Sequence, residues 1–139
     1  MSEPSADLAR LDRLVGTWRA AGGTGGTVTY EWMDGRFFLL QRVALEQNGQ
    51  TITGLEVIGH EHKYGEEPSA DIKSRFYGSE GGTLDYVYEL IDDKLTIWMG
   101  ERGSPAYYAG TFTDDDTITG AWVYPGGGGY DAIMTRVKD

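Results

Sequence analysis

The chain has 139 residues, and its 22 Asp and Glu against 12 Lys and Arg give a formal net charge of −10. This charge repels phosphate backbones and anionic lipid headgroups, which argues against nucleic acids and membrane surfaces as partners. The sequence contains no Cys, so disulfides and thiolate chemistry are excluded, while 21 Gly with 4 Pro are typical of short strands joined by tight turns.

The length predicts one domain over residues 1–139, with residues 1–4 disordered. The first residues carry several charges, including Glu3, Asp7 and Arg10, and lack the apolar stretch of a secretion signal. No later segment is apolar enough for a membrane-spanning helix. We therefore expect a cytoplasmic protein.

One segment has helical periodicity, and it covers residues 5–15. Leu8, Leu11 and Leu14 recur at helical spacing, Ser5 precedes them as a candidate N-cap, and Gly16 follows. The pattern predicts a short helix that closes one end of the domain.

The rest of the chain alternates between apolar and polar residues, in runs separated by Gly, Asn and Asp. Val28, Tyr30 and Trp32 share one face of the clearest run, and Asn48-Gly49 is a hairpin signal. Strands are predicted from Gly16, around residues 27–32 and 37–46, and over 51–62, 70–79, 83–90, 94–100, 106–113, 117–124 and 130–138.

Ten strands with connections too short for crossover helices must pair antiparallel with their neighbours. The predicted fold is therefore all-β: a single up-and-down antiparallel barrel of about ten strands over residues 16–138, with a short N-terminal helix. A two-sheet sandwich is the alternative, but sequential hairpins with one aromatic inward face favour a barrel.

Gly16-Thr17-Trp18, directly after the helix, resembles the Gly-x-Trp signature of the calycin superfamily of lipocalin-like barrels. In that superfamily the Trp closes one barrel end beneath a basic side chain of the last strand. The resemblance implies structural roles for Trp18 and Arg136, and stacking of a guanidinium on an indole is a sound reason for such a pair.

The chain from residue 14 to 137 is also similar to a bacterial family of nitrobindin-related barrels of unknown function. The similarity rests on Tyr30-Glu31-Trp32, Gly35-Arg36-Phe37-Phe38-Leu39, Gly54-Leu55-Glu56-Val57-Ile58-Gly59, Leu95-Thr96-Ile97-Trp98, Gly110-Thr111-Phe112-Thr113 and Gly120-Ala121-Trp122. Nitrobindins hold haem through a His late in their sequence. Here the two His are at positions 60 and 62, so we expect neither haem nor another cofactor.

Alternation along the strands predicts an apolar lumen with several hydroxyl groups. Its inward-facing residues either surround a small-molecule cavity or fill the core. The predicted ligand-binding residues are Tyr30, Trp32, Phe37, Leu39, Gln41, Phe76, Tyr86, Tyr88, Met99, Tyr108 and Trp122.

Glu56 and His60 are the candidate catalytic residues, because Glu56, Ile58 and His60 share one strand face. A carboxyl group inside the lumen would have a raised pKa and could accept a proton, with His60 near the mouth. The opposite alternation places Leu55 and Val57 inside instead, and the pattern does not decide between the two.

Three further motifs favour structural interpretations. His60-Glu61-His62 lacks an identified third ligand and is typical of a charged strand end, so we expect no metal site. Asp114-Asp115-Asp116 indicates a polar turn. The glycine-rich residues 22–26 precede a strand, and therefore lack the helix that a phosphate loop requires.

The leading functional hypothesis is a barrel that binds a small apolar or aromatic molecule. The alternatives are an acid–base enzyme, such as an isomerase, cyclase or hydrolase acting on a hydrophobic metabolite, and a filled interaction barrel. Phe38 and Leu40 on the outer face could support a homodimer.

Overall fold

The computed structural model of the protein describes residues 3–138. Its N-terminal segment is helical as predicted, but in two short pieces: the α-helix α1 (Ala6–Ala9) and the 3₁₀ helix η1 (Arg10–Leu14). Ser5 is the N-cap residue, yet its hydroxyl contacts the Asp7 carboxylate and caps no backbone N–H. The disorder predicted for residues 1–4 falls in part on residues 1 and 2, which lie outside the described residues. Neither described helix is long and apolar enough to cross a membrane.

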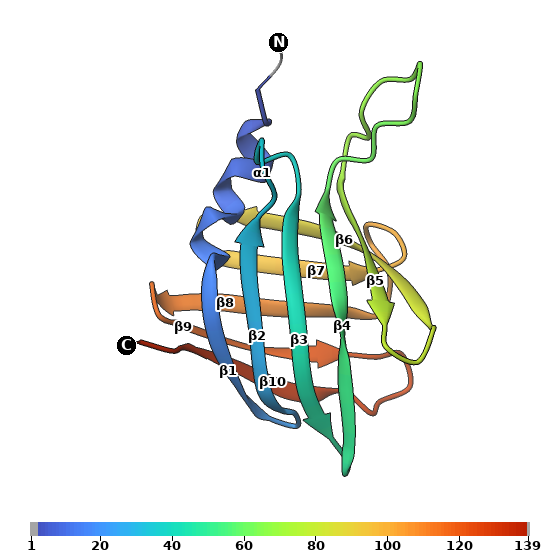
Figure 1. The fold of residues 1–139 in the computed structure, drawn as a ribbon. Helices are drawn as coiled ribbons and strands as arrows, with labels where there is room; N and C mark the ends of the chain where they lie inside the picture. The colour runs from blue at the N-terminus through green and yellow to red at the C-terminus, as the bar shows by residue number, and fades with distance from the viewer. Residues whose placement is uncertain (1–2, 139) are drawn as a thin grey trace.

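Ten antiparallel strands follow and close into a barrel, which confirms the predicted fold class. They are β1 (Gly16–Gly22), β2 (Gly25–Trp32), β3 (Leu39–Gln47), β4 (Gln50–Gly59), β5 (Ile72–Gly78), β6 (Thr83–Ile91), β7 (Lys94–Met99), β8 (Tyr107–Asp114), β9 (Thr117–Val123) and β10 (Tyr130–Arg136). Each strand pairs with the next, and β10 pairs with β1 (Figure 1). Closure leaves neither outer strand with an unpaired edge.

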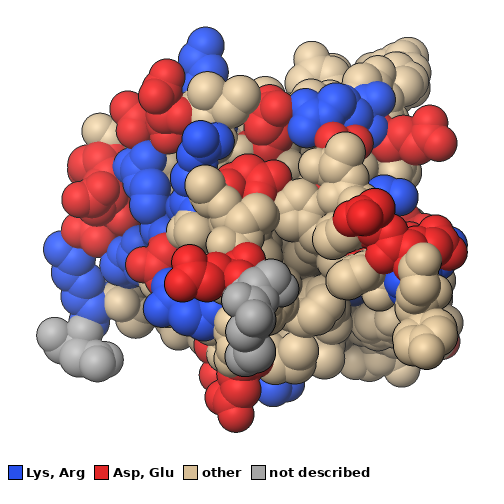
Figure 2. All heavy atoms as spheres, turned by 90° about the horizontal axis from the view of Figure 1, so that it is seen from above, with Lys and Arg blue, Asp and Glu red and all other residues tan. Residues whose placement is uncertain are grey.

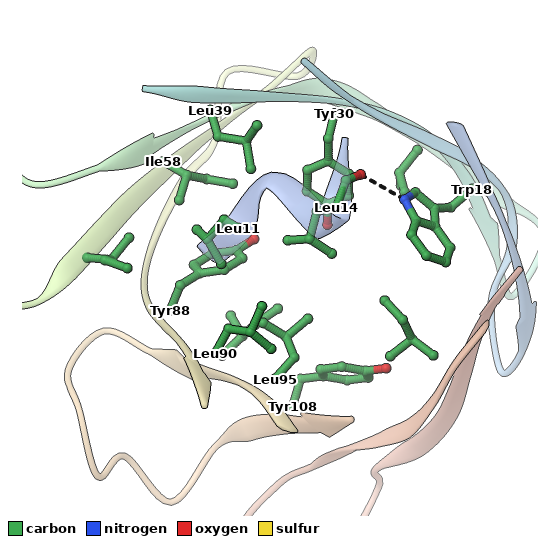
Figure 3. Close-up of a cluster of buried hydrophobic side chains, with 14 of the residues drawn as sticks. Leu11, Leu14, Trp18, Tyr30, Leu39, Ile58, Tyr88, Leu90, Leu95 and Tyr108 are labelled. Carbon is green, nitrogen blue, oxygen red and sulfur yellow. Dashed lines mark hydrogen bonds between the residues drawn. The ribbon is translucent and has the colours of Figure 1, made fainter. Parts of the chain in front are cut away.

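The helical segment lies across one end of the barrel, which we call the helix end (Figure 1). Leu8, Leu11 and Leu14 are fully buried there. Figure 3 shows Leu11 and Leu14 inside the ring of strands, among inward-pointing side chains of the barrel. Burial of each Leu side chain contributes about 1.5–3 kcal/mol, so these side chains explain how so short a helical segment stays docked.

Trp18 and Arg136 close the same end. Trp18 is completely buried, and its indole N–H donates to the carbonyl of Leu14 at 2.8 Å (Figure 3). The Arg136 guanidinium lies 4.3 Å from the Trp18 ring centre and donates to the carbonyls of Arg13 and Val15 at 2.7 and 2.5 Å. The predicted pairing is therefore confirmed, and the closed barrel with its N-terminal helix is consistent with a calycin-like fold.

Charged side chains of both signs interleave on the outer surface of the helix end (Figure 2). Arg13 lies 3.0 Å from Asp93 and 3.5 Å from Asp115, and it stacks on Phe112 at 3.9 Å from the ring centre. Exposed ion pairs typically contribute between 0 and about 1 kcal/mol each. Apolar burial therefore stabilises this end more than its surface charges do.

Candidate functional site

A cluster of buried polar side chains lies inside the barrel. It consists of Tyr30, Gln41, Glu56, Ser74 and Tyr88, which come from the consecutive strands β2 to β6. Gln41 donates through Nε2 to the Tyr30 hydroxyl at 2.8 Å, and the Tyr88 hydroxyl donates to Glu56 Oε2 at 2.7 Å. We call this set the lumen cluster.

The position of Glu56 decides the alternation of β4, which the sequence left open. Glu56 is 5% exposed and Ile58 is fully buried, whereas Leu55 and Val57 are only half-buried on the other face. Strand register explains this choice, because Glu56 pairs directly with the inward-facing Gln41 on β3. Cross-strand partners share a face, so Glu56 follows Gln41 into the lumen.

Burial controls the electrostatics of the cluster. Desolvation raises the pKa of Glu56 above its ordinary value of 4.5, although the nearby hydroxyls of Ser74 and Tyr88 lower it in part. Desolvation, with the Glu56 charge as the next cause, also raises the pKa of Tyr30 and of Tyr88. Burial therefore makes this carboxyl group easier to protonate than an exposed glutamate, and the two phenols remain neutral hydrogen-bond donors.

Ser74 is the one buried side chain in residues 3–138 whose polar atom lacks a hydrogen-bond partner. It is 6% exposed, and it lies on β5 between the inward-facing Ile72 and Phe76. Its hydroxyl is near the Glu56 carboxyl, but the two do not form a hydrogen bond of ordinary geometry. An unsatisfied buried hydroxyl lowers the free energy of unfolding by about 1–3 kcal/mol. A bound molecule could supply the missing hydrogen-bond partner at this position.

The barrel end opposite the helix, which we call the open end, exposes apolar side chains that face inward. Ile52 and Leu84 are 37% and 45% exposed, although each pairs across the sheet with an inward-facing neighbour, Leu45 and Phe76 respectively. Inward-facing side chains are solvated where a barrel is not capped. The helical segment therefore covers one end of the barrel, and inward-facing apolar side chains are partly exposed at the other.

Aromatic rings line the wall between the lumen cluster and the open end. The ring of Trp122 lies 6.1 Å from that of Tyr86 and 5.5 Å from that of Tyr108, measured between centres. Tyr108 fits closely because Gly110 and Gly120 have no side chains: a Cβ on Gly110 would lie 2.6 Å from its hydroxyl oxygen. Tyr108 donates to the carbonyl of Ala132 at 3.1 Å, and burial raises its pKa to about 12.

The predicted ligand-binding residues occupy different parts of the barrel. Three of them belong to the lumen cluster: Tyr30, Gln41 and Tyr88. Five others lie toward the open end: Phe76, Tyr86, Met99, Tyr108 and Trp122. Leu39 is completely buried in the core of the helix end. Trp32 is half-buried at that end, where its indole N–H donates to Asp12 at 2.8 Å.

Phe37 is not in the lumen, which corrects its predicted position. β3 begins at Leu39, and residues 33–38 form a tight connection in which Gly35 and Arg36 have φ of 89° and 62°. Alternation therefore stops before Phe37, which is 38% exposed. It lines an apolar cleft of about 720 Å³ outside the barrel, together with Leu8 and other residues of the helix end.

His60 also lies away from Glu56, so the structure does not bring the two candidate catalytic residues together. β4 ends at Gly59, and the His60 ring turns to the helix end, where Nε2 lies 3.0 Å from Asp7 Oδ1. Its Nδ1 lies 2.6 Å from the carbonyl of Ser69. His60 thus ties α1 to the segment after β4, outside the lumen cluster.

Sequence reasoning missed Ser74, although the signal was present. Phe76 was expected to face inward, and Ser74, two positions before it on the same strand, must share its face. His60 and His62 form no ligand set, since no group of three His, Asp or Glu side chains suited to a metal occurs within residues 3–138. Phe38 and Leu40 are half-buried, and a homodimer through them stays a prediction.

Comparison of the chain with protein-family models gives no match, and neither does comparison with curated proteins. No relative therefore supports the resemblance to nitrobindin-related barrels.

Proposed function

We propose that the protein binds a small, mainly apolar or aromatic molecule inside the barrel, reached from the open end. One observation carries the proposal: a buried polar cluster with an unsatisfied hydroxyl, at Ser74, lies inside a barrel that exposes inward-facing apolar side chains at one end. Small-molecule sites combine apolar walls with a few convergent polar groups. The lumen has this composition.

The polar groups of the cluster have unused hydrogen-bonding capacity. Tyr30 accepts from Gln41, so its own hydrogen can be donated, and Glu56 accepts from Tyr88 on Oε2 while Oε1 can take another partner. A ligand whose polar group reaches Ser74 and Glu56 would satisfy groups that are otherwise buried at a cost. Its apolar body would pack against Tyr86, Trp122 and their neighbours.

Native mass spectrometry tests this function directly. We expect the protein, incubated with a deproteinised cell extract, to retain a discrete non-covalent mass that denaturation releases. Ser74→Leu should lose that mass, because an apolar side chain would cover the lumen cluster. The control Lys73→Leu changes the adjacent, outward-facing residue and should retain it. A bare wild-type chain, or an adduct kept equally by a folded Ser74→Leu variant, would contradict the proposal.

Acid–base catalysis is the second candidate, and the pairing of Glu56 with Tyr88 favours it. A buried carboxyl group with a raised pKa can remove a proton from a carbon next to a carbonyl and return it elsewhere, while the neutral phenol of Tyr30, whose hydrogen is free, donates to the developing oxyanion. His60 has no part in this scheme, since it is bonded to Asp7 and Ser69.

Deuterium exchange separates binding from turnover. If Glu56 transfers protons, a captured molecule held in D₂O should gain deuterium at one carbon with the wild-type protein but not with Glu56→Gln. Retention of the same molecule without deuterium incorporation would leave binding as the function and reject catalysis on that molecule.

A further inference from the structure

The lumen cluster contains a carboxyl group without a cationic partner. Among the described strand residues that face inward, the charged residue types, tyrosines aside, are Glu56 and Arg136. Arg136 is held at the helix end by Trp18, Asp116 and backbone carbonyls. Glu56 therefore has the phenol of Tyr88 as its hydrogen-bond donor and no protein cation beside it.

Aromatic rings surround this carboxyl group. Tyr30, Tyr86 and Tyr88 are close enough for the Glu56 charge to contribute to the raised pKa of each phenol. Trp122 extends the aromatic wall from Tyr86 toward the open end. A carboxylate among tyrosine side chains is a combination that can recognise an organic ammonium group, because aromatic ring quadrupoles and the carboxylate both attract positive charge.

The charges around the open end favour the same class of molecule. The loops and strand ends there carry Glu46, Glu80, Glu101 and Asp131. Arg102, in the loop after β7, is engaged by Glu89 at 2.6 Å and Asp71 at 3.0 Å. With a net charge of −10 on the chain, the field draws small cations toward the mouth and repels anions.

We propose that the molecule bound in the lumen is a small organic cation, an aromatic or aliphatic amine whose ammonium group pairs with Glu56 among the tyrosine rings. The inference rests on the proposed small-molecule function and names the ligand class of that same site. The ammonium group donates to Glu56, Ser74 Oγ accepts a further N–H, and the apolar body lies toward Trp122. An anionic ligand would instead place like charge against Glu56.

Three probes of similar size and different charge test the ligand class: phenethylamine, phenethyl alcohol and hydrocinnamate. Binding is measured by calorimetry and by tryptophan fluorescence at about pH 8. We expect the amine to bind the wild-type protein about tenfold more tightly than the alcohol or better, and hydrocinnamate to bind weakest. Glu56→Gln should reduce amine affinity to that of the alcohol and leave alcohol affinity nearly unchanged.

Two further variants control the result. Glu31→Gln removes an exposed carboxylate on the outer face of β2 and should keep the amine preference. Glu56→Asp keeps the negative charge and should retain part of that preference, which separates loss of charge from a folding defect. An amine preference that persists in a folded Glu56→Gln variant would overturn the assignment to Glu56.

The outcomes also distinguish the proposed ligand class from the small-molecule binding on which it rests. If the alcohol or hydrocinnamate binds as tightly as the amine, the ligand class is wrong while small-molecule binding stands. If none of the three binds at millimolar concentration and no mass is retained from the extract, both proposals fail.

Discussion

Inward-facing side chains are buried at one end of the barrel and partly exposed at the other. At the helix end the inward-facing Trp18 and Leu39 have no exposed surface, whereas at the open end the inward-facing Ile52 and Leu84 are 37% and 45% exposed. The helical segment supplies three Leu side chains to the helix end. The helix end is therefore the better packed of the two, and the lumen cluster adjoins it, because Tyr30 and Tyr88 belong to the same buried core as Leu11 and Leu14.

The polar side chains differ in whether their hydrogen-bonding and charge partners are present. Arg136 at the helix end makes ordered contacts with backbone carbonyls and with Trp18, while Ser74 lacks a partner and Glu56 lacks a cation. Satisfied polar groups stabilise a fold, and unsatisfied ones cost stability unless a ligand completes them. Substitutions at the satisfied and at the unsatisfied polar groups should therefore have opposite consequences for stability.

The largest effect is expected when Trp18 is replaced. Trp18→Ala should lower the free energy of unfolding by about 3–5 kcal/mol, because it leaves a cavity at the fully buried helix end. Trp122→Ala, the matched change near the open end, should cost much less because that residue is half-buried. Urea unfolding of both variants measures the difference. Equal losses would mean that the two ends are packed alike.

Arg136 gives the next largest effect. Arg136→Met should cost about 2–3 kcal/mol, since it removes charge-assisted hydrogen bonds to buried carbonyls together with the stacking on Trp18. The control Arg19→Met lies on the same strand as Trp18 but points outward, and should change stability by less than about 0.5 kcal/mol. Thermal denaturation checks the pair, and an Arg136→Met variant as stable as Arg19→Met would refute the role of Arg136 in closing the barrel.

Glu56→Gln should raise the free energy of unfolding, by an amount that depends on pH. Because the pKa of Glu56 is raised in the folded state, the folded protein binds this proton more tightly than the unfolded chain. The Glu56 contribution to stability is therefore retained below pH 4.5 and lost progressively as pH rises toward the raised pKa. Each unit of pKa difference corresponds to about 1.4 kcal/mol.

Relative to wild type, Glu56→Gln should thus gain stability as pH rises above 4.5, until the raised pKa of Glu56 is passed. Urea unfolding across this range measures the gain, with the exposed Glu31→Gln as the control that should follow wild type. If the free energy of unfolding of Glu56→Gln changes with pH in parallel with that of wild type, Glu56 is solvated.

The smallest effect is expected at Ser74. Ser74→Ala removes a buried hydroxyl that has no partner, so stability should stay the same or rise by up to about 1 kcal/mol. Ligand retention should weaken in the same variant. A loss of stability above about 1 kcal/mol would indicate that the Ser74 hydroxyl is satisfied inside the empty barrel.

The sequence was sufficient for the architecture because alternation and turn residues repeat in every hairpin. Gly16-Thr17-Trp18 and Arg136 were enough to predict the closed end correctly. The site was harder to predict, because it depends on where each strand stops. Residues 33–38 form a turn that moves Phe37 out of the lumen, and β4 ends just before His60.

The direction of Glu56 could not be read from its own strand. Leu55, Val57 and Ile58 are all apolar, so both faces of β4 are acceptable to a core, and the local pattern has no preference. The choice is made by neighbouring strands, through the pairing of Glu56 with Gln41 and of Ile58 with Leu39. Such register is a property of the whole sheet, which no single run of residues encodes.

Titration of the Glu56 carboxyl group tests most directly the claim that the lumen holds a buried polar site. The measurement is carbon-detected NMR on protein labelled in glutamate side chains, with Glu56→Gln identifying the resonance. We predict that Glu56 titrates above 4.5 in the ligand-free protein, separately from the exposed glutamates. A Glu56 carboxyl that titrates at or below 4.5 with the other glutamates would contradict a desolvated carboxyl in the lumen.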